Sequence, residues 1–242
     1  MYFPRIIKST LQKALEIAKL HLLVEKFSYS FLKFIYTCKY IKWRRQQQLD
    51  DFYGYCRKNP ERTSELNFHY YLIDEENLGT SQIDYLEFGV EKGNSMRWTL
   101  ENSANPKSAF FGFDSFMGLP EKWEFQSEGT FSVNGKVPVI SDPRCKIYSG
   151  GFHETLPRFL TQHTFNRKSV IYLDADIYSS TLYVLTTIAH RLKTGDILLL
   201  GDFDGAMHVF RAFLDFTAAY PVKLKLIAEM DRFSKVAFKV IE

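Results

Sequence analysis

The sequence predicts a Rossmann-like α/β fold: a mostly parallel seven-stranded sheet with a C-terminal antiparallel hairpin, preceded by an N-terminal helical extension. Two observations carry this prediction. From residue 83 onward, short apolar runs alternate with segments of helical periodicity, which is typical of parallel strands that helices cover on both faces. The last two apolar runs are separated only by a polar turn at 230–232, which indicates a hairpin.

The expected elements fill most of the chain beyond residue 78. The expected strands cover 83–90, 109–114, 146–149, 170–174, 197–202, 223–229 and 235–241. The expected helices cover about 94–104, 153–163, 179–193 and 206–219. The chain therefore divides into a helical extension over 1–78 and an α/β domain over 79–242.

The N-terminal segment is strongly basic, since residues 1–60 carry twelve Lys or Arg and only four Asp or Glu. Apolar residues at helical spacing predict one helix over 8–24 and a second over 27–48. Three partners stay open for these helices: the main domain, a second copy in a homo-oligomer such as a dimer, or an anionic membrane surface. We expect no nucleic-acid partner. The two apolar stripes consist of Leu11, Leu15, Ala18 and Leu22, and of Phe27, Phe31, Phe34, Cys38 and Ile41.

The cysteines and the first apolar stretches bear on the compartment. Cys38, Cys56 and Cys145 are far apart and odd in number, so we expect no disulfide framework and a reducing, cytoplasmic setting. Lysines interrupt every early apolar stretch, so we expect neither a signal peptide nor a membrane span. A peripheral membrane contact through the basic helices remains compatible with this setting.

One connection is unusually long. Residues 115–145 join the second and third strands with little helical pattern, and Asn134-Gly135 indicates a hairpin within them. The connection leaves the carboxyl end of the second strand, where open α/β sheets bind their ligands. We interpret it as a lid over a binding site, and a decorative insertion is the alternative.

A glycine-rich turn follows the first strand. Gly89 and Gly93 would let the backbone approach a ligand, and a helix that begins at Asn94 or Ser95 would offer free N–H groups to an anion. Asp114 ends the second strand 21 residues after Gly93, at the distance typical of a carboxylate that binds ribose hydroxyls. The turn and Asp114 together predict a nucleoside-containing cofactor.

Carboxylates also end the next two central strands. Asp174 and Asp176 follow the run at 170–173, and Asp202 and Asp204 follow the run at 197–200. Carboxylate oxygens are the ligands that hard divalent cations prefer, and a carboxylate is also a candidate general base. The Asp174-Ala175-Asp176 box equally resembles the metal box of nucleotide-sugar glycosyltransferases, which is the alternative enzyme class.

Four strings in this part of the chain carry a more specific resemblance. They read EFGVEKGNS at 87–95, GFDSFMGLPE at 112–121, GFHETLP at 151–157 and LDADIYSST at 173–181. In this order they resemble the motifs of the macrocin O-methyltransferase family. The members of that family are class I S-adenosylmethionine-dependent enzymes that methylate sugar hydroxyls, usually with magnesium. The resemblance implies a small-molecule or glycan acceptor.

The resemblance assigns roles to individual residues. It implies that Asp174 is a metal ligand and serves as the catalytic base or lies next to it. It implies metal ligation by Asp202 and, as a substitute ligand, by Asp204. The implied cofactor-binding residues are Glu87, Gly89, Gly93 and Ser95 at the methionine end, Asp114 and Ser115 at the ribose, and Gly150, Gly151 and Phe152 at the adenine, with Asp174 beside them.

The chain departs from the family pattern after the fifth strand. Gly201 stands where the first of two adjacent acidic residues is usual, so only Asp202 is matched. This departure motivates a third interpretation, a methyltransferase fold that binds cofactor without turnover. His208 lies a few residues further on and is a candidate catalytic base near neutral pH.

Overall fold

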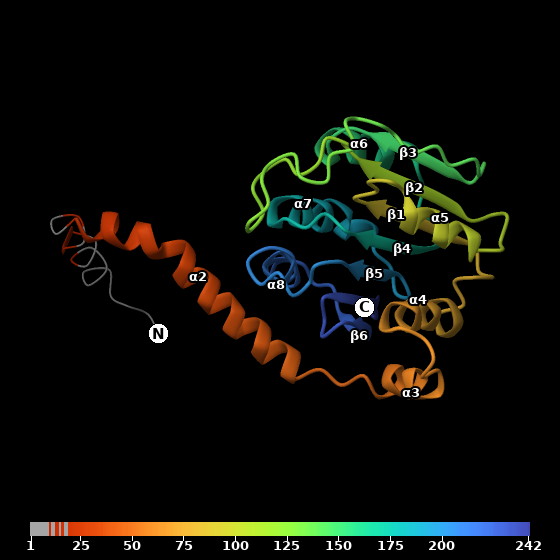
Figure 1. The fold of residues 1–242 in the computed structure, drawn as a ribbon, viewed down its shortest axis with the longest axis horizontal. Helices are drawn as coiled ribbons and strands as arrows, with labels where there is room; N and C mark the ends of the chain where they lie inside the picture. Colours follow the sequence, from red (N-terminus) through yellow and green to blue (C-terminus); the bar gives the residue numbers. More distant parts are fainter. Residues whose placement is uncertain (1–9, 11–12, 15, 17–18) are drawn as a thin grey trace.

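The structure is a computed structural model that describes residues 10, 13, 14, 16 and 19–242, and its centre is one seven-stranded sheet (Figure 1). The strand order is β3-β2-β1-β4-β5-β7-β6. The first five strands pair in parallel, and β7 pairs antiparallel with both β5 and β6, which confirms the predicted fold class. The strands are β1 (Ile83–Phe88), β2 (Ala109–Asp114), β3 (Cys145–Ser149), β4 (Lys168–Leu173), β5 (Ile197–Leu200), β6 (Leu224–Met230) and β7 (Lys235–Val240).

Three central strands end earlier than the sequence predicts. β1, β4 and β5 stop just before Gly89, Asp174 and Gly201. One sheet-like hydrogen bond continues past each end: the amides of these residues donate to the carbonyls of Phe113, Phe88 and Leu173 at 3.0, 2.8 and 2.8 Å. Gly89, Asp174 and Gly201 therefore lie side by side along the carboxyl edge of the sheet.

Helices cover both faces of the sheet (Figure 1). One face carries α4 (Ser64–Glu75) and α5 (Asn94–Glu101), and the other carries α6 (Phe152–Gln162), α7 (Tyr178–Ile188) and α8 (Val209–Ala219). The short helix η1 (Ala189–Arg191) continues α7. The central strands are buried on both faces, which explains why their sequences show no alternation.

The N-terminal part contains α2 (Leu20–Arg45) and α3 (Asp50–Lys58) before α4. The predicted break between two helices near residue 25 is wrong, because α2 runs unbroken and contains neither Gly nor Pro there. Seven of the seventeen residues of the helix predicted over 8–24, among them Leu11, Leu15 and Ala18, lie outside the described residues. The helices α3 and α4, which are short and flank Asn59-Pro60, were not predicted individually within the helical extension.

The connection predicted over 115–145 forms no named strand or helix before β3 begins at Cys145. The hairpin predicted at Asn134-Gly135 is wrong, although the Lys136 amide donates to the Val133 carbonyl at 3.1 Å and closes a turn. The flanking backbone has another partner, because the amides of Val133 and Gly135 donate to the Phe116 carbonyl. The segment therefore folds back on its own beginning instead of pairing across the turn.

Candidate active site

Two glycines allow neighbouring segments of the chain to approach each other closely at the carboxyl edge of the sheet. Gly89 has a left-handed φ of 93°, and a Cβ atom there would lie 2.0 Å from the carbonyl oxygen of Asp174. A Cβ atom on Gly201 would lie 1.9 Å from Oδ1 of Asp174. The main chain and the carboxylate of Asp174 thus occupy space that side chains at 89 and 201 would need.

A cavity of about 580 Å³ opens above this edge. Most of the residues expected to bind a cofactor line it, from the ends of β1, β2, β3 and β4. Lid residues Leu119, Pro120 and Phe131 line it as well, so the 115–145 connection lies over the cavity. The expected residues in its lining are Gly89, Asp114, Ser115, Gly150, Gly151, Phe152 and Asp174.

A second cavity of about 560 Å³ lies between the sheet and helices α4 and α5. It meets the first cavity at Gly89, Glu91 and Asp174, which line both. Ser95, one of the expected cofactor ligands, lines this second cavity. The structure therefore distributes eight of the ten expected cofactor residues over two cavities that share one edge.

Glu87 and Gly93 line neither cavity. The carboxyl of Glu87 is fully buried and accepts hydrogen bonds from the hydroxyls of Ser95 at 2.6 Å and Tyr85 at 2.9 Å. Burial raises the pKa of Glu87 to about 8. Gly93 precedes α5 with a φ of 75°. In this structure both residues shape the glycine turn and the start of α5.

The carboxylate of Asp114 holds the same turn from the other side. Its Oδ2 accepts hydrogen bonds from the amides of Val90 and Glu91, both at 2.8 Å, and its Oδ1 accepts one from Phe116 at 2.7 Å. A carboxylate has about four acceptor positions, so about one is left to face the cavity. Asp114 thus fixes the backbone of the turn and also lines the first cavity.

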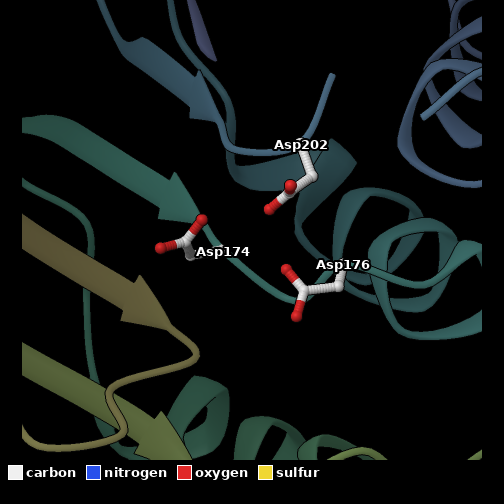
Figure 2. A group of neighbouring side chains, drawn as sticks. All are labelled: Asp174, Asp176 and Asp202. Atoms are coloured by element: carbon white, nitrogen blue, oxygen red, sulfur yellow. The ribbon is translucent and has the colours of Figure 1, made fainter. Parts of the chain in front are cut away.

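Three carboxylates converge where β4 and β5 end. Oxygen atoms of Asp174, Asp176 and Asp202 all lie within 4.8 Å of one another, and Figure 2 shows the side chains pointing toward a common space. Asp176 and Asp202 have left-handed φ angles of 59° and 46°, a strained conformation that clusters at functional sites. Asp204, expected among the ligands, is exposed and lies outside this group, whereas Asp176 was not in the expected metal set.

Burial and carboxylate repulsion act together on this group. Burial, followed by the neighbouring Asp202, raises the pKa of Asp176 to about 8. Burial likewise raises the pKa of Asp202, and the charges of Asp174 and Asp204 add to the effect. A bound cation would remove this repulsion, so the donor set fits a hard divalent metal.

Two further residues orient Asp174. The phenol of Tyr172 donates a hydrogen bond to Oδ2 of Asp174 at 2.8 Å, and Nζ of Lys235 donates to the phenol oxygen of Tyr172. An ammonium group can only donate, so the phenol proton is directed toward Asp174. Neither Tyr172 nor Lys235 was predicted from the sequence as a site residue. Lys235 carries no local signal, because only the pairing of β7 with β5 brings it to this edge.

His208, the second expected catalytic residue, immediately precedes α8 and lines neither cavity. Neither ring nitrogen has a hydrogen-bond partner among the described residues. Burial lowers the pKa of His208, although the charges of the lid residues Glu124 and Glu121 oppose this shift. The structure therefore places the imidazole near the lid and does not bring it into either cavity.

The sheet order and the cavities at its carboxyl edge define a Rossmann-like α/β protein with a ligand site at the ends of its parallel strands. The chain belongs to the macrocin-O-methyltransferase family, whose model matches residues 72–238. It is thus an S-adenosylmethionine-dependent O-methyltransferase, which decides against the glycosyltransferase alternative.

Solved structures with this fold include two methyltransferases and a cmcI structure. The calicheamicin methyltransferase CalS11 is 19% identical, with a TM-score of 0.59 over 84% of this chain and 91% of that one. The O-methyltransferase NovP is 21% identical, with a TM-score of 0.53 over 70% and 75%. A cmcI structure described as "Mg-SAM" is 14% identical, with a TM-score of 0.52 over 75% and 72%. No curated protein sequence matches the chain.

Proposed function

We propose that this protein transfers the methyl group of S-adenosylmethionine to a hydroxyl of a sugar, with a divalent cation held by Asp174, Asp176 and Asp202. The observation that carries the proposal is the position of these three carboxylates. Asp174 lines both cavities together with Gly89, and Asp176 lines the first cavity. An oxygen of Asp202 lies within 4.8 Å of oxygens of both. A methyl donor bound along the glycine turn would present its sulfonium group to the edge that the two cavities share.

The residues that line the two cavities can accommodate the adenine, the ribose and the methionine part of S-adenosylmethionine. Gly150, Gly151 and Phe152 offer a wall for the adenine, and the remaining acceptor position of Asp114 faces the ribose. The methionine part would extend past Gly89 toward Ser95 at the start of α5, where free amides favour a carboxylate. Ser115 lies beside Asp114 in the same lining.

Asp174 is the residue placed to take the proton of the acceptor. The Tyr172 hydrogen bond fixes Oδ2, and Gly201 leaves room for Oδ1. Asp174 accepts the hydroxyl proton as the hydroxyl oxygen bonds to the methyl carbon and the carbon–sulfur bond breaks, leaving S-adenosylhomocysteine. The cation, when bound, lowers the pKa of the hydroxyl. Positioning and the exclusion of water beneath the lid supply much of the rate.

The family and the structural relatives support a sugar acceptor and a magnesium ion. The family model is named for macrocin O-methylation, and one structure of CalS11 is described as a TDP-rhamnose 3'-O-methyltransferase. The description of the cmcI structure names magnesium together with S-adenosylmethionine. The three clustered carboxylates of this chain, Asp174, Asp176 and Asp202, offer the oxygen ligands that magnesium prefers.

Calorimetry and a transfer assay test the proposal on the full chain. S-Adenosylmethionine should bind to the parent and to Asp174→Asn alike, whereas methyl transfer to TDP-rhamnose or related nucleotide sugars should fall at least about a hundred-fold in the variant. Unchanged turnover in Asp174→Asn would refute the role of this residue. Cofactor binding with no transfer to any sugar, with or without magnesium, would refute the proposed sugar acceptor.

A further inference from the structure

The outer face of α2 carries a continuous apolar stripe. Val24, Phe27, Phe31, Phe34 and Ile41 recur at helical spacing and are all exposed. The three phenylalanines are 65%, 65% and 66% exposed. At 1.5 Å per residue the stripe extends over about 26 Å. An exposed apolar surface of this length indicates an interaction site.

The opposite face of α2 fixes the direction of the stripe. The Trp43 ring packs edge-on against Phe203 and Phe210, and Tyr40 donates a hydrogen bond to the Arg232 carbonyl at 3.1 Å. Lys33 binds the lid carboxylate of Glu124 at 2.5 Å. The helix is therefore anchored by its C-terminal half and projects from the body (Figure 1). The side chains of the stripe are exposed along it.

The charges of α2 distinguish between possible partners. The helix contains Glu25 as its only acidic residue, against six basic residues: Lys26, Lys33, Lys39, Lys42, Arg44 and Arg45. Two copies joined stripe to stripe would bring these cations together, which costs free energy. Leu22, Tyr29 and Leu32 are further exposed apolar residues of α2 itself. The exposed large apolar side chains of the other described segments are scattered over α3, α4, the lid and the C-terminus, so the body offers no matching stripe.

We propose that α2 lies along an anionic phospholipid surface, with Phe27, Phe31 and Phe34 inserted among the headgroups. Apolar residues flanked by Lys and Arg are typical of helices that bind in the plane of an anionic interface. Among the described helices none is both long and apolar enough to cross a bilayer. The inference concerns a different surface from the active site and does not depend on the acceptor.

Vesicle sedimentation with the full chain tests this proposal. The protein should sediment with phosphatidylcholine vesicles that contain phosphatidylserine, should stay in solution with phosphatidylcholine alone, and should be released by added salt. The variant Phe27→Ser/Phe31→Ser/Phe34→Ser should bind at least about ten-fold more weakly. Lys26→Glu/Lys39→Glu/Lys42→Glu, which changes only exposed cations, should also lose binding.

Controls separate surface binding from misfolding and from self-association. Phe125→Ser removes a 95% exposed phenylalanine from the lid and should leave vesicle binding unchanged. All variants should keep the thermal transition of the parent in circular dichroism. The proposal is overturned if the parent ignores anionic vesicles, if the triple Phe variant binds them as the parent does, or if sedimentation equilibrium shows a dimer that this variant dissociates.

Discussion

A Cβ atom at Gly201 would lie 1.9 Å from Oδ1 of Asp174, so the carboxylate of Asp174 occupies the space of a side chain at position 201. The family pattern places an acidic residue at this position, and its absence would suggest a weakened metal site. The geometry supports a different interpretation. The glycine lets Asp174 lean toward β5, while Asp176 completes the group of three carboxylates.

Restoring a carboxylate at position 201 should therefore reduce activity. In Gly201→Asp the new side chain displaces Asp174 from the Tyr172 hydrogen bond, and a misplacement of about 1 Å costs about a hundred-fold in rate. Gly201→Ala should act in the same direction. Steady-state kinetics measure the effect, and calorimetry should show unchanged S-adenosylmethionine binding. Higher turnover in Gly201→Asp would mean that the missing carboxylate is a true deficiency.

The Tyr172 phenol should contribute to turnover through the orientation of Asp174. Tyr172→Phe removes the hydrogen bond to Oδ2, and the loss of one such bond to a charged acceptor lowers kcat by about ten-fold to a hundred-fold. The KM for S-adenosylmethionine should stay unchanged. Lys235→Met should act in the same direction and Lys235→Arg should keep more activity, because arginine can still donate to the phenol.

Tyr220→Phe, at the far end of α8, serves as the matched control for this pair. It should leave kcat unchanged. If Tyr172→Phe instead raised the KM for S-adenosylmethionine without lowering kcat, the phenol would act in binding and not on the base.

The site residues at the carboxyl ends of the strands could be predicted from the sequence, because a glycine or an aspartate stands there at the end of an apolar run. Gly89, Asp114 and Asp174 each follow an apolar run, and the structure brings them to one cavity. Asp176 and Asp204 could not be distinguished in this way. Both lie two residues beyond a predicted ligand, and only the left-handed turns at Asp176 and Asp202 decide which carboxylate turns inward.

Contacts between distant segments were out of reach of the sequence. Lys235 reaches Tyr172 only because β7 inserts between β5 and β6, an order that no local pattern encodes. The prediction of a hairpin at Asn134-Gly135 failed for the same reason. The backbone amides that would pair the two hairpin strands donate instead to the Phe116 carbonyl. The turn at Asn134-Gly135 was predicted correctly, but the backbone segment that bonds to its flanking residues was not.

The buried carboxyl of Glu87 should make stability depend on pH. Burial raises its pKa from 4.5 to about 8, so between these values the folded state keeps a proton that the unfolded state has released. Stability contributed by this group is therefore complete below about pH 4.5 and declines as the pH rises to about 8. Thermal melts across this range should show a smaller decline for Glu87→Gln than for the parent. If stability declined equally with pH in both proteins, a group other than Glu87 would be responsible for the decline.

The choice between Asp176 and Asp204 as metal ligand is open to a direct comparison. The oxygens of Asp176 lie within 4.8 Å of those of Asp174 and Asp202, whereas Asp204 is exposed and lies outside this group. Asp176→Asn should lower the affinity for magnesium by more than about ten-fold, because one of three anionic ligands is lost. Asp204→Asn removes the same charge two residues from Asp202 and should change the affinity by less than about two-fold, since surface charges contribute little. Titration calorimetry with magnesium alone measures both variants. The reverse ranking would assign the third ligand to Asp204 and would require the loop after β5 to turn inward when the cation binds.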